Sequence, residues 1–344
     1  LQSDMHAGNF ILQSDYLYSL DGDAIKQITT RRTGVGPKVG LKNLALLIAQ
    51  LSFVHEINKM AVYNVYCKHR CLVPAKRLFA YFVKQIDKKT KKIRHKVLQK
   101  TLRECSSFMA QSGLTLRSIC ERDQSKTMLP ALLPLLDRKL KDQSLADGVY
   151  KTTAYETVKL PIKDSTVMVK RYAVRNLYEG FLHGLGFSKA RKEWLNAHSL
   201  ALIRVPIVNA LAYCEKGIFP WFGKTFLVTE FVEGISLKEF VLLNEHDNEA
   251  LTNVFESLAF TFEKLARSLI TYGDMDANRF LVTKQGVLLT DFDKIKQHRS
   301  AKSFNHQSRQ QFNAFLQNWQ SNPQVANMAI SAFKKSGLIK SFLE

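Results

Sequence analysis

The sequence has no apolar stretch long enough to cross a membrane, and it has few cysteines. Its longest apolar stretches, residues 44–54 and 128–136, are interrupted and fall well short of the roughly 20 residues that a spanning helix needs. No secretory signal is visible, so nothing in the sequence indicates export. The five cysteines are irregularly spaced, which indicates a reducing compartment rather than a disulfide framework. Because the chain begins with Leu1 rather than Met, we expect a fragment of a longer protein.

A zinc site has little support in the sequence. Cys67 and Cys71 flank His69, which is a suggestive cluster of metal-ligating residue types. No second pair of Cys or His residues follows at the spacing of a structural zinc site. We therefore interpret the two thiols as neighbours one helical turn apart.

Acidic residues are scarce, with 30 Asp and Glu against 50 Lys and Arg, and the net charge is +20. Such an excess favours an anionic partner, which includes nucleic acid, an anionic membrane surface or a phosphorylated glycolipid. No base-reading motif is recognisable, so no nucleic acid is expected. Residues 84–100 are rich in lysine and form either a solvated helix face or a contact to anionic lipid headgroups.

One acidic motif occurs twice. Residues 274–282 read Asp-Met-Asp-Ala-Asn-Arg-Phe-Leu-Val, and the same spacing that leads from Asp274 to Asp291 also leads from Asp4 to Asp21. Two acids joined by a short hairpin are typical of kinase-like folds. The first acid orients the acceptor hydroxyl, and the second binds Mg²⁺ on the nucleotide phosphates. The repeat predicts a duplicated kinase-like unit with Asp4 and Asp274 as the catalytic acids.

The order of the expected elements favours an α+β, protein-kinase-like fold with two lobes. Residues 1–143 are expected to form the mostly helical C-terminal lobe of a first, truncated unit, with helices over 41–140. The polar stretch 141–148 marks the boundary. Residues 144–344 are expected to form a second unit, with a strand-rich lobe at about 149–230 and a helical lobe at about 235–344.

Four residues of the second unit are candidates for nucleotide binding. Lys170 lies in an alternating strand, where a kinase-like fold uses a lysine to contact the α- and β-phosphates, and Glu193 on the next expected helix suits a partner that fixes it. An apolar strand then runs into a turn with Glu230 and Val232, whose backbone groups would pair with adenine. No Gly-rich loop precedes Lys170, so a phosphate cover would come from the turn at 150–156, which favours divergent small-molecule or lipid kinases.

The second unit resembles the lipopolysaccharide core kinases, the heptose and Kdo kinase family of bacteria. The likeness lies in Val169-Lys170, in the helix at 189–197, in Thr229-Glu230, in Gly273-Asp274 and in residues 291–294. The resemblance implies ATP- and Mg²⁺-dependent phosphorylation of a lipopolysaccharide core or lipid-linked sugar. It also implies a cytoplasmic protein, peripheral at the anionic inner-membrane surface of a Gram-negative bacterium.

The metal residues differ between the two copies. Kinases of this type place an Asn five residues after the catalytic Asp, and the first copy has Asn9 there. The second copy has Arg279 at that position and Asn278 one residue earlier. The expected metal ligands are therefore Asp291, Asn278, Asn9 and Asp21. Two hypotheses stay open: a core-sugar kinase, or a non-catalytic pseudokinase module that binds or regulates in the same pathway.

Overall fold

The computed structural model divides the chain into two compact units, Leu1–Gln99 and Lys100–Glu344. Among the helices of the described residues, none is both long and apolar enough to cross a membrane. The structure describes residues 7–14, 16–20, 25, 35–51, 57–113, 115–125, 128, 130, 149–151, 155–162, 165–172, 174, 188–217, 223–273 and 275–338.

The first unit holds a short hairpin and helices. A 3₁₀ turn at Ala7–Asn9 leads into the antiparallel strands β1 and β2, in which Leu12 faces Leu17. The helices pack around a small core that includes Leu41, Tyr63 and Phe82. Cys67 is buried in this core, while Cys71 is exposed. The bounds are β1 Phe10–Gln13, β2 Tyr16–Ser19, α1 Pro37–Leu51, α2 Lys59–His69 and α3 Lys76–Lys100.

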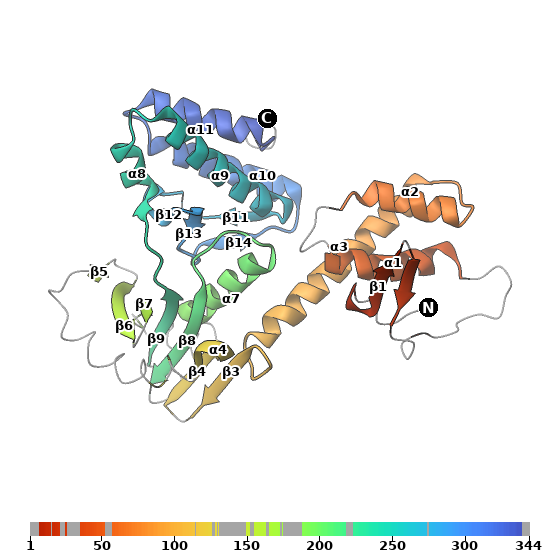
Figure 1. Ribbon diagram of the computed structural model, residues 1–344, viewed down its shortest axis with the longest axis horizontal. Coiled ribbons are helices and arrows are strands. Elements are labelled where there is room, and N and C mark those ends of the chain that lie inside the picture. The colour runs from red at the N-terminus through yellow and green to blue at the C-terminus, as the bar shows by residue number, and fades with distance from the viewer. Residues whose placement is uncertain are drawn as a thin grey trace. The chain divides into compact units, whose positions relative to one another are not determined.

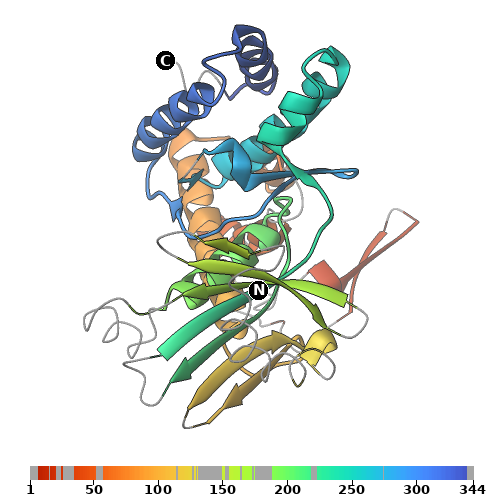
Figure 2. The same cartoon turned by 90° about the vertical axis from the view of Figure 1, so that its left-hand side faces the viewer.

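The second unit is built on a seven-stranded antiparallel sheet, seen from two sides in Figures 1 and 2. Strand alternation places Val167 and Val169 on one buried face and Lys170 and Tyr172 on the other. Helix α7, Lys189–Leu202, packs on the second face through Trp194. The strands, in spatial order, are β3 Phe108–Ser112, β4 Leu116–Glu121, β8 Ala210–Gly217, β9 Gly223–Glu230, β7 Ser165–Tyr172, β6 Glu156–Ile162 and β5 Val149–Lys151.

The first two strands of this sheet lie where the sequence predicted helices. Residues 41–140 were expected to belong to a helical lobe, but β3 and β4 form a hairpin, and Ile119 of β4 pairs with Tyr213 of β8. Pairing with a distant strand decides the conformation here, since β-propensity depends strongly on neighbours. The division into compact units accordingly falls between Gln99 and Lys100, upstream of the boundary expected at 143/144.

Helices and small sheets complete the second unit after β9. Helix starts are fixed by side-chain caps, such as Ser236 accepting from the backbone N–H of Glu239. Strands followed by helices confirm the predicted α+β, kinase-like order. The bounds are β10 Ile235–Ser236, α8 Leu237–Leu243, α9 Asn248–Arg267, β11 Ile270–Tyr272, β12 Phe280–Thr283, β13 Gly286–Leu289, β14 Ile295–Gln297, α10 Ala301–Gln317 and α11 Pro323–Lys335. The short helix α4, Arg122–Ser125, comes earlier in the chain, directly after β4.

Candidate active site

Lys170 is held between two carboxylates. Its position in β7 turns it towards α7, where its Nζ lies 3.2 Å and 3.4 Å from the two carboxylate oxygens of Glu193. The same Nζ also contacts Oδ1 of Asp291. The side chains of Lys170, Glu193 and Asp291 are 12%, 0% and 6% exposed, so these charges are compensated inside the protein rather than by water.

Glu193 is fixed by its helix and by a tyrosine. Ser188 caps α7 by accepting from the backbone N–H of Arg191, which sets where the helix begins. The hydroxyl of Tyr172 donates to Oε1 of Glu193. On the next residue, the Trp194 indole donates to the carbonyl of Thr101 at 2.9 Å, so the helix is anchored to the segment that precedes β3.

Asp291 lies two residues after the end of β13 and contacts Tyr155, the residue before β6. It follows β13, and the next residue, Phe292, is fully buried, with its carbonyl accepting from the side chain of Asn196 at 2.6 Å. Tyr155, just before β6, donates its hydroxyl to Oδ2 of Asp291 at 2.9 Å. The Nζ of Lys170 lies 4.6 Å from the centre of the Tyr155 ring. The turn at 150–156 thus places one aromatic side chain at this carboxylate.

The loop between β11 and β12 brings an arginine to the acidic residues. Arg279 Nη1 lies 2.9 Å from Oδ2 of Asp291 and 3.3 Å from Oδ1 of Asp293. Asn278 is exposed and donates to Oδ1 of Asp276 at 2.9 Å. Of the neighbouring residues Asn278 and Arg279, it is therefore Arg279 that contacts Asp291 and Asp293. Asp274 lies outside the described residues.

Gly273 allows the close approach that shapes this loop. Its N–H donates to the carbonyl of Lys294 at 3.1 Å, and a Cβ added at residue 273 would lie 2.4 Å from that carbonyl oxygen. Backbone groups cannot yield at such a distance, so the strand preceding the loop requires glycine there. The contact ties the start of the loop to the residues that follow Asp293.

The electrostatics keep the central groups charged. Burial lowers the pKa of Lys170, but the ion pairs with Glu193 and Asp291 outweigh burial and raise it. For Asp291, burial raises the pKa, yet Lys170 and Arg279 lower it below the usual range of a carboxyl. Burial raises the pKa of Glu193 and that of Tyr155. At neutral pH this leaves a fixed ammonium and a fixed carboxylate facing each other.

The segment that links the lobes contains Glu230 and Val232. The N–H of Glu230 donates to the carbonyl of Asn209 at 3.0 Å, and its side chain accepts from the N–H of Asn209 at 2.9 Å. Gly234 packs so tightly that a Cβ there would lie 2.5 Å from the carbonyl oxygen of Val282. The linking segment is thus held against β12.

The first copy of the motif is partly described. Asp4 and Asp21 lie outside the described residues. Asn9 ends a 3₁₀ turn directly before β1, and its carbonyl accepts from the N–H of Leu20 at 2.9 Å. Arg279 ends the corresponding turn before β12, and its carbonyl accepts from the N–H of Thr290 at 3.3 Å. The two residues therefore occupy equivalent places in two like hairpins.

Two groups of the site were not assigned roles from sequence. The contact of Tyr155 with Asp291 joins residues far apart in the chain, and only the range 150–156 pointed to it. The pairing of Arg279 with both acids was not predicted either, although its position after Asp274 was noted as unusual. A signal existed in that case, since an arginine placed beside two carboxylates is expected to pair with them.

The donor set fits a hard cation in its chemistry. Oxygen atoms of Glu193, Asp291 and Asp293 lie within 4.8 Å of one another, and no other such cluster occurs among the described residues. Carboxylate oxygens are suitable ligands for Mg²⁺. Two side-chain cations already pair with Asp291, however, so a metal ion would share this carboxylate with Lys170 and Arg279.

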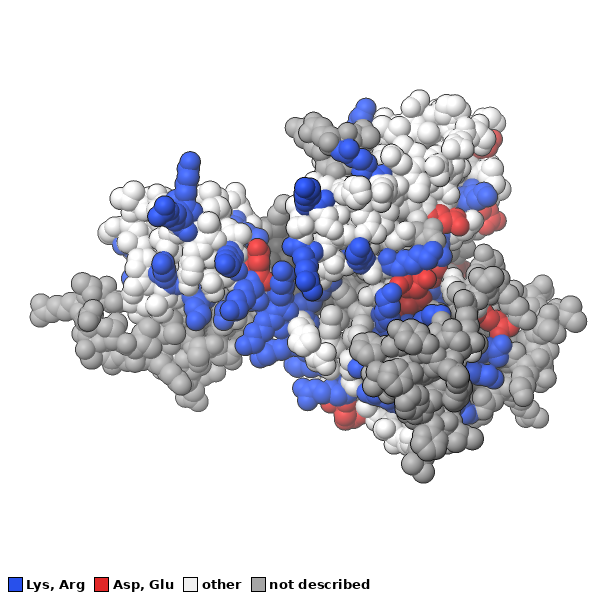
Figure 3. Space-filling model, turned by 180° about the vertical axis from the view of Figure 1, so that it is seen from behind, with Lys and Arg blue, Asp and Glu red and all other residues white. Residues whose placement is uncertain are grey.

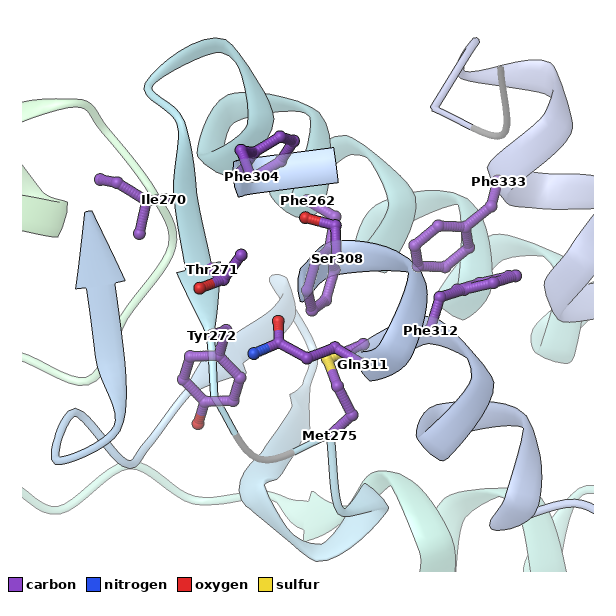
Figure 4. A pocket seen from close by; sticks show the side chains of 10 residues that line it. All are labelled: Phe262, Ile270, Thr271, Tyr272, Met275, Phe304, Ser308, Gln311, Phe312 and Phe333. Carbon is purple, nitrogen blue, oxygen red and sulfur yellow. The ribbon is translucent and has the colours of Figure 1, made fainter. Parts of the chain in front are cut away.

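A small cavity lies next to the loop between β11 and β12, and it is too small to hold a sugar. Figure 4 shows Thr271 and Tyr272 of β11 facing side chains of α10 across it. Its volume of about 10 Å³ leaves room for roughly one water molecule. The helical lobe is thus well packed directly behind the loop, and the ion cluster rather than this cavity is the candidate site.

Comparison with known proteins gives a family match. Residues 152–335 match the model of the lipopolysaccharide kinase (Kdo/WaaP) family. Among solved structures, a chain described as WaaP in complex with acyl carrier protein aligns with a TM-score of 0.42 at 16% identity. That alignment covers 65% of this chain and 91% of the other. A comparison with curated proteins finds no match.

Proposed function

Because the chain belongs to the lipopolysaccharide kinase (Kdo/WaaP) family, we propose that it transfers phosphate from ATP to a sugar of the lipopolysaccharide inner core. The observation that carries this proposal is the buried contact of Lys170 with both Glu193 and Asp291. It joins a strand, a helix and the end of a hairpin from two lobes. A lysine held this way is suited to nucleotide phosphates.

In this proposal the residues have separate tasks. Lys170, whose raised pKa keeps it protonated, contacts the α- and β-phosphates, and Glu193 holds its position. Asp274 orients the acceptor hydroxyl. The backbone groups of Glu230 and Val232 pair with adenine. Since phosphoryl transfer depends mainly on positioning and charge neutralisation, no strongly shifted pKa is needed at Asp274.

Asp291, assisted by Asp293, is the proposed holder of Mg²⁺. When bound, Mg²⁺ neutralises charge on the nucleotide phosphates. The lowered pKa of Asp291 keeps its carboxylate available at neutral pH. Asn278, also predicted as a ligand, would first have to leave Asp276, to which its side chain donates. In the first copy, Asp4, Asn9 and Asp21 are proposed to serve the same tasks in the first unit.

The test of transfer is Asp274→Asn in the whole chain. We expect loss of phosphate transfer to inner-core acceptors with nucleotide affinity retained, because Asp274 is proposed to touch the acceptor rather than ATP. The matched control is Asp247→Asn, an exposed cap at the start of α9 that Asn can also cap. Equal transfer by both variants would contradict the proposal.

A pseudokinase is the second candidate, and one observation favours it. Arg279 pairs with Asp291 where a kinase would carry a metal-binding Asn. In that case the second unit binds nucleotide or regulates, and chemistry belongs to a complete first unit. Unchanged transfer by Asp274→Asn, together with nucleotide binding that Lys170→Met removes, would support this candidate.

The basic helix α3 is proposed to hold the protein at an anionic membrane surface on the cytoplasmic side. Lys and Arg side chains gather over this helix (Figure 3), and Lys84, Lys88, Lys91 and Lys92 are exposed. Each lysine near such a surface contributes about 1 kcal/mol. Co-sedimentation with vesicles rich in anionic lipid should fall when these four lysines become Gln, while vesicles of zwitterionic lipid should bind neither form.

A further inference from the structure

The guanidinium of Arg279 bridges the two acids at the centre of the site. It lies 2.9 Å from Asp291 and 3.3 Å from Asp293, and its side chain is 20% exposed. Charge-assisted contacts of a planar guanidinium with carboxylates are among the stronger polar contacts in proteins. The arginine is therefore part of the site rather than a solvated surface residue.

The backbone fixes the place of this side chain. Arg279 ends a 3₁₀ turn in which its N–H donates to the carbonyl of Asp276 at 3.0 Å. Its own carbonyl accepts from the hydroxyl of Thr290 at 3.0 Å, and Thr290 directly precedes Asp291. Arg279 and Asp291 are thus held together in two ways: by their side-chain ion pair, and by the hydrogen bond between the Arg279 carbonyl and Thr290. The fold itself therefore positions this pair.

The equivalent residue of the first hairpin has different chemistry. Asn9 offers an amide oxygen, which can bind a hard cation. Arginine has five donors and no acceptor, and its charge repels a metal ion. In kinase sites the Asn at this place holds the second Mg²⁺ together with the acid that follows the hairpin. Arg279 cannot do so.

We propose that Arg279 takes the place of the second divalent cation, so that the second unit binds nucleotide with a single metal ion. The proposal rests on nucleotide binding by this unit, as set out above. The guanidinium is then the fixed positive charge that the phosphates meet beside Asp291.

The charges of the site agree with this assignment. Among the described residues, three carboxylates (Glu193, Asp291 and Asp293) face two side-chain cations (Lys170 and Arg279), which leaves a surplus of one negative charge before Asp274 is counted. An Asn at residue 279 would leave a surplus of two. Because the nucleotide phosphates add further negative charge, the site with Arg279 needs less metal charge than a site with Asn at residue 279.

The test counts metal ions in the nucleotide complex of the whole chain. Mn²⁺ is titrated in the presence of a saturating non-hydrolysable ATP analogue, and the free ion is measured by electron paramagnetic resonance. We expect Arg279→Asn to bind about one Mn²⁺ more than the natural chain, and Arg279→Lys to bind as many as the natural chain. Arg267→Asn, which removes an exposed arginine paired with Glu263, should bind as the natural chain does.

A second readout uses no metal. In excess chelator, the analogue should bind Arg279→Asn at least ~10-fold more weakly than the natural chain, because a charged contact to phosphate is lost. An equal number of bound Mn²⁺ in the natural chain and in Arg279→Asn would overturn the inference alone. Absence of any nucleotide binding, with or without Mn²⁺, would overturn the proposed function and this inference with it.

Discussion

The hairpins β1–β2 and β12–β13 are alike in backbone and opposite in burial. Each follows a three-residue 3₁₀ turn, and each consists of two four-residue antiparallel strands joined by two residues. Leu12 faces Leu17 in the first, and Val282 faces Val287 in the second. Leu12 and Leu17 are 71% and 67% exposed, whereas Val282 and Val287 are 6% and 1% exposed.

This difference shows that the local sequence determines whether a hairpin forms, whereas the packing of the surrounding lobe determines whether it is buried. Turn, strand length and pairing arise from the local pattern, so both hairpins form. Burial of the second depends on aromatic neighbours: the ring of Phe280 lies 6.1 Å from that of Phe262 and 6.0 Å from that of Phe315. The burial of the second hairpin thus depends on helices of its own lobe, which contribute Phe262 and Phe315.

The largest expected effect comes from the phenylalanine that begins the first strand of each hairpin, Phe10 in β1 and Phe280 in β12. Phe280 is fully buried, so Phe280→Ala should cost about 3–5 kcal/mol of unfolding free energy in the second unit. Phe10 occupies the same place in β1 and is only partly buried, so Phe10→Ala should cost less than half of that. Urea unfolding of the two variants measures the comparison, and equal losses would contradict it.

Exchanging one residue between the copies gives the next effect. The first copy has Ser3 where the second has Gly273. Gly273→Ser would place a Cβ 2.4 Å from the carbonyl oxygen of Lys294, so we expect a loss of about 2–3 kcal/mol together with weaker nucleotide binding. Thermal unfolding and nucleotide titration check this. The control is Gly36→Ser in the first unit, where an added Cβ meets nothing within 4 Å.

Acid should weaken the second unit through His198. Burial lowers the pKa of His198 to about 4, and its ring packs between Phe108 and Trp194. An unfolded histidine has a pKa near 6.5, so the unfolded state takes up the proton first. Stability is complete above pH ~6.5 and is lost as the pH falls towards 4.

We expect this loss to reach about 1–2 kcal/mol, since the partial exposure of the ring reduces the full effect of the shift. His198→Gln should flatten the fall of the melting temperature between pH 6.5 and 4, and the exposed His246→Gln should leave it unchanged. An unaltered slope in His198→Gln would show that the imidazole does not titrate with folding.

The smallest effect is expected in the exposed hairpin. Leu12→Thr and Leu17→Thr introduce a β-branched residue that suits a strand and remove apolar surface that already faces solvent. Each should change the unfolding free energy by less than about 0.5 kcal/mol. The equivalent change Val287→Thr buries a hydroxyl and should cost more. Urea unfolding of all three variants compares them.

The sequence alone located those site residues that can be recognised by their order along the chain. The kinase-like order of Lys170, Glu193 and Asp291 was visible because a lysine in an alternating strand, a glutamate in the next helix and the acidic motif follow one another along the chain. The structure places these three in mutual contact. The α+β fold followed from the same order.

Contacts between distant segments were not accessible from the pattern. Strand β4 of the β3–β4 hairpin pairs with β8, about a hundred residues away, and nothing in its local sequence marks that partner. The approach of Arg279 to both acids depends on the main-chain tie to Thr290, which spacing alone does not show. Tertiary pairing overrode local preference in the first case, and side-chain geometry decided the second.

The hairpin β3–β4 covers the edge of β8 and places the outer edge of the seven-stranded sheet at the short strand β3. Strand β4 covers the side of β8 that would otherwise present a row of free N–H and C=O groups. A bare edge of this kind is a template on which a second copy can add its own strand. A shortened protein that begins at residue 144 would lose this cover. We therefore expect it to associate more readily than a protein that begins at Lys100, in which β4 stays paired with β8.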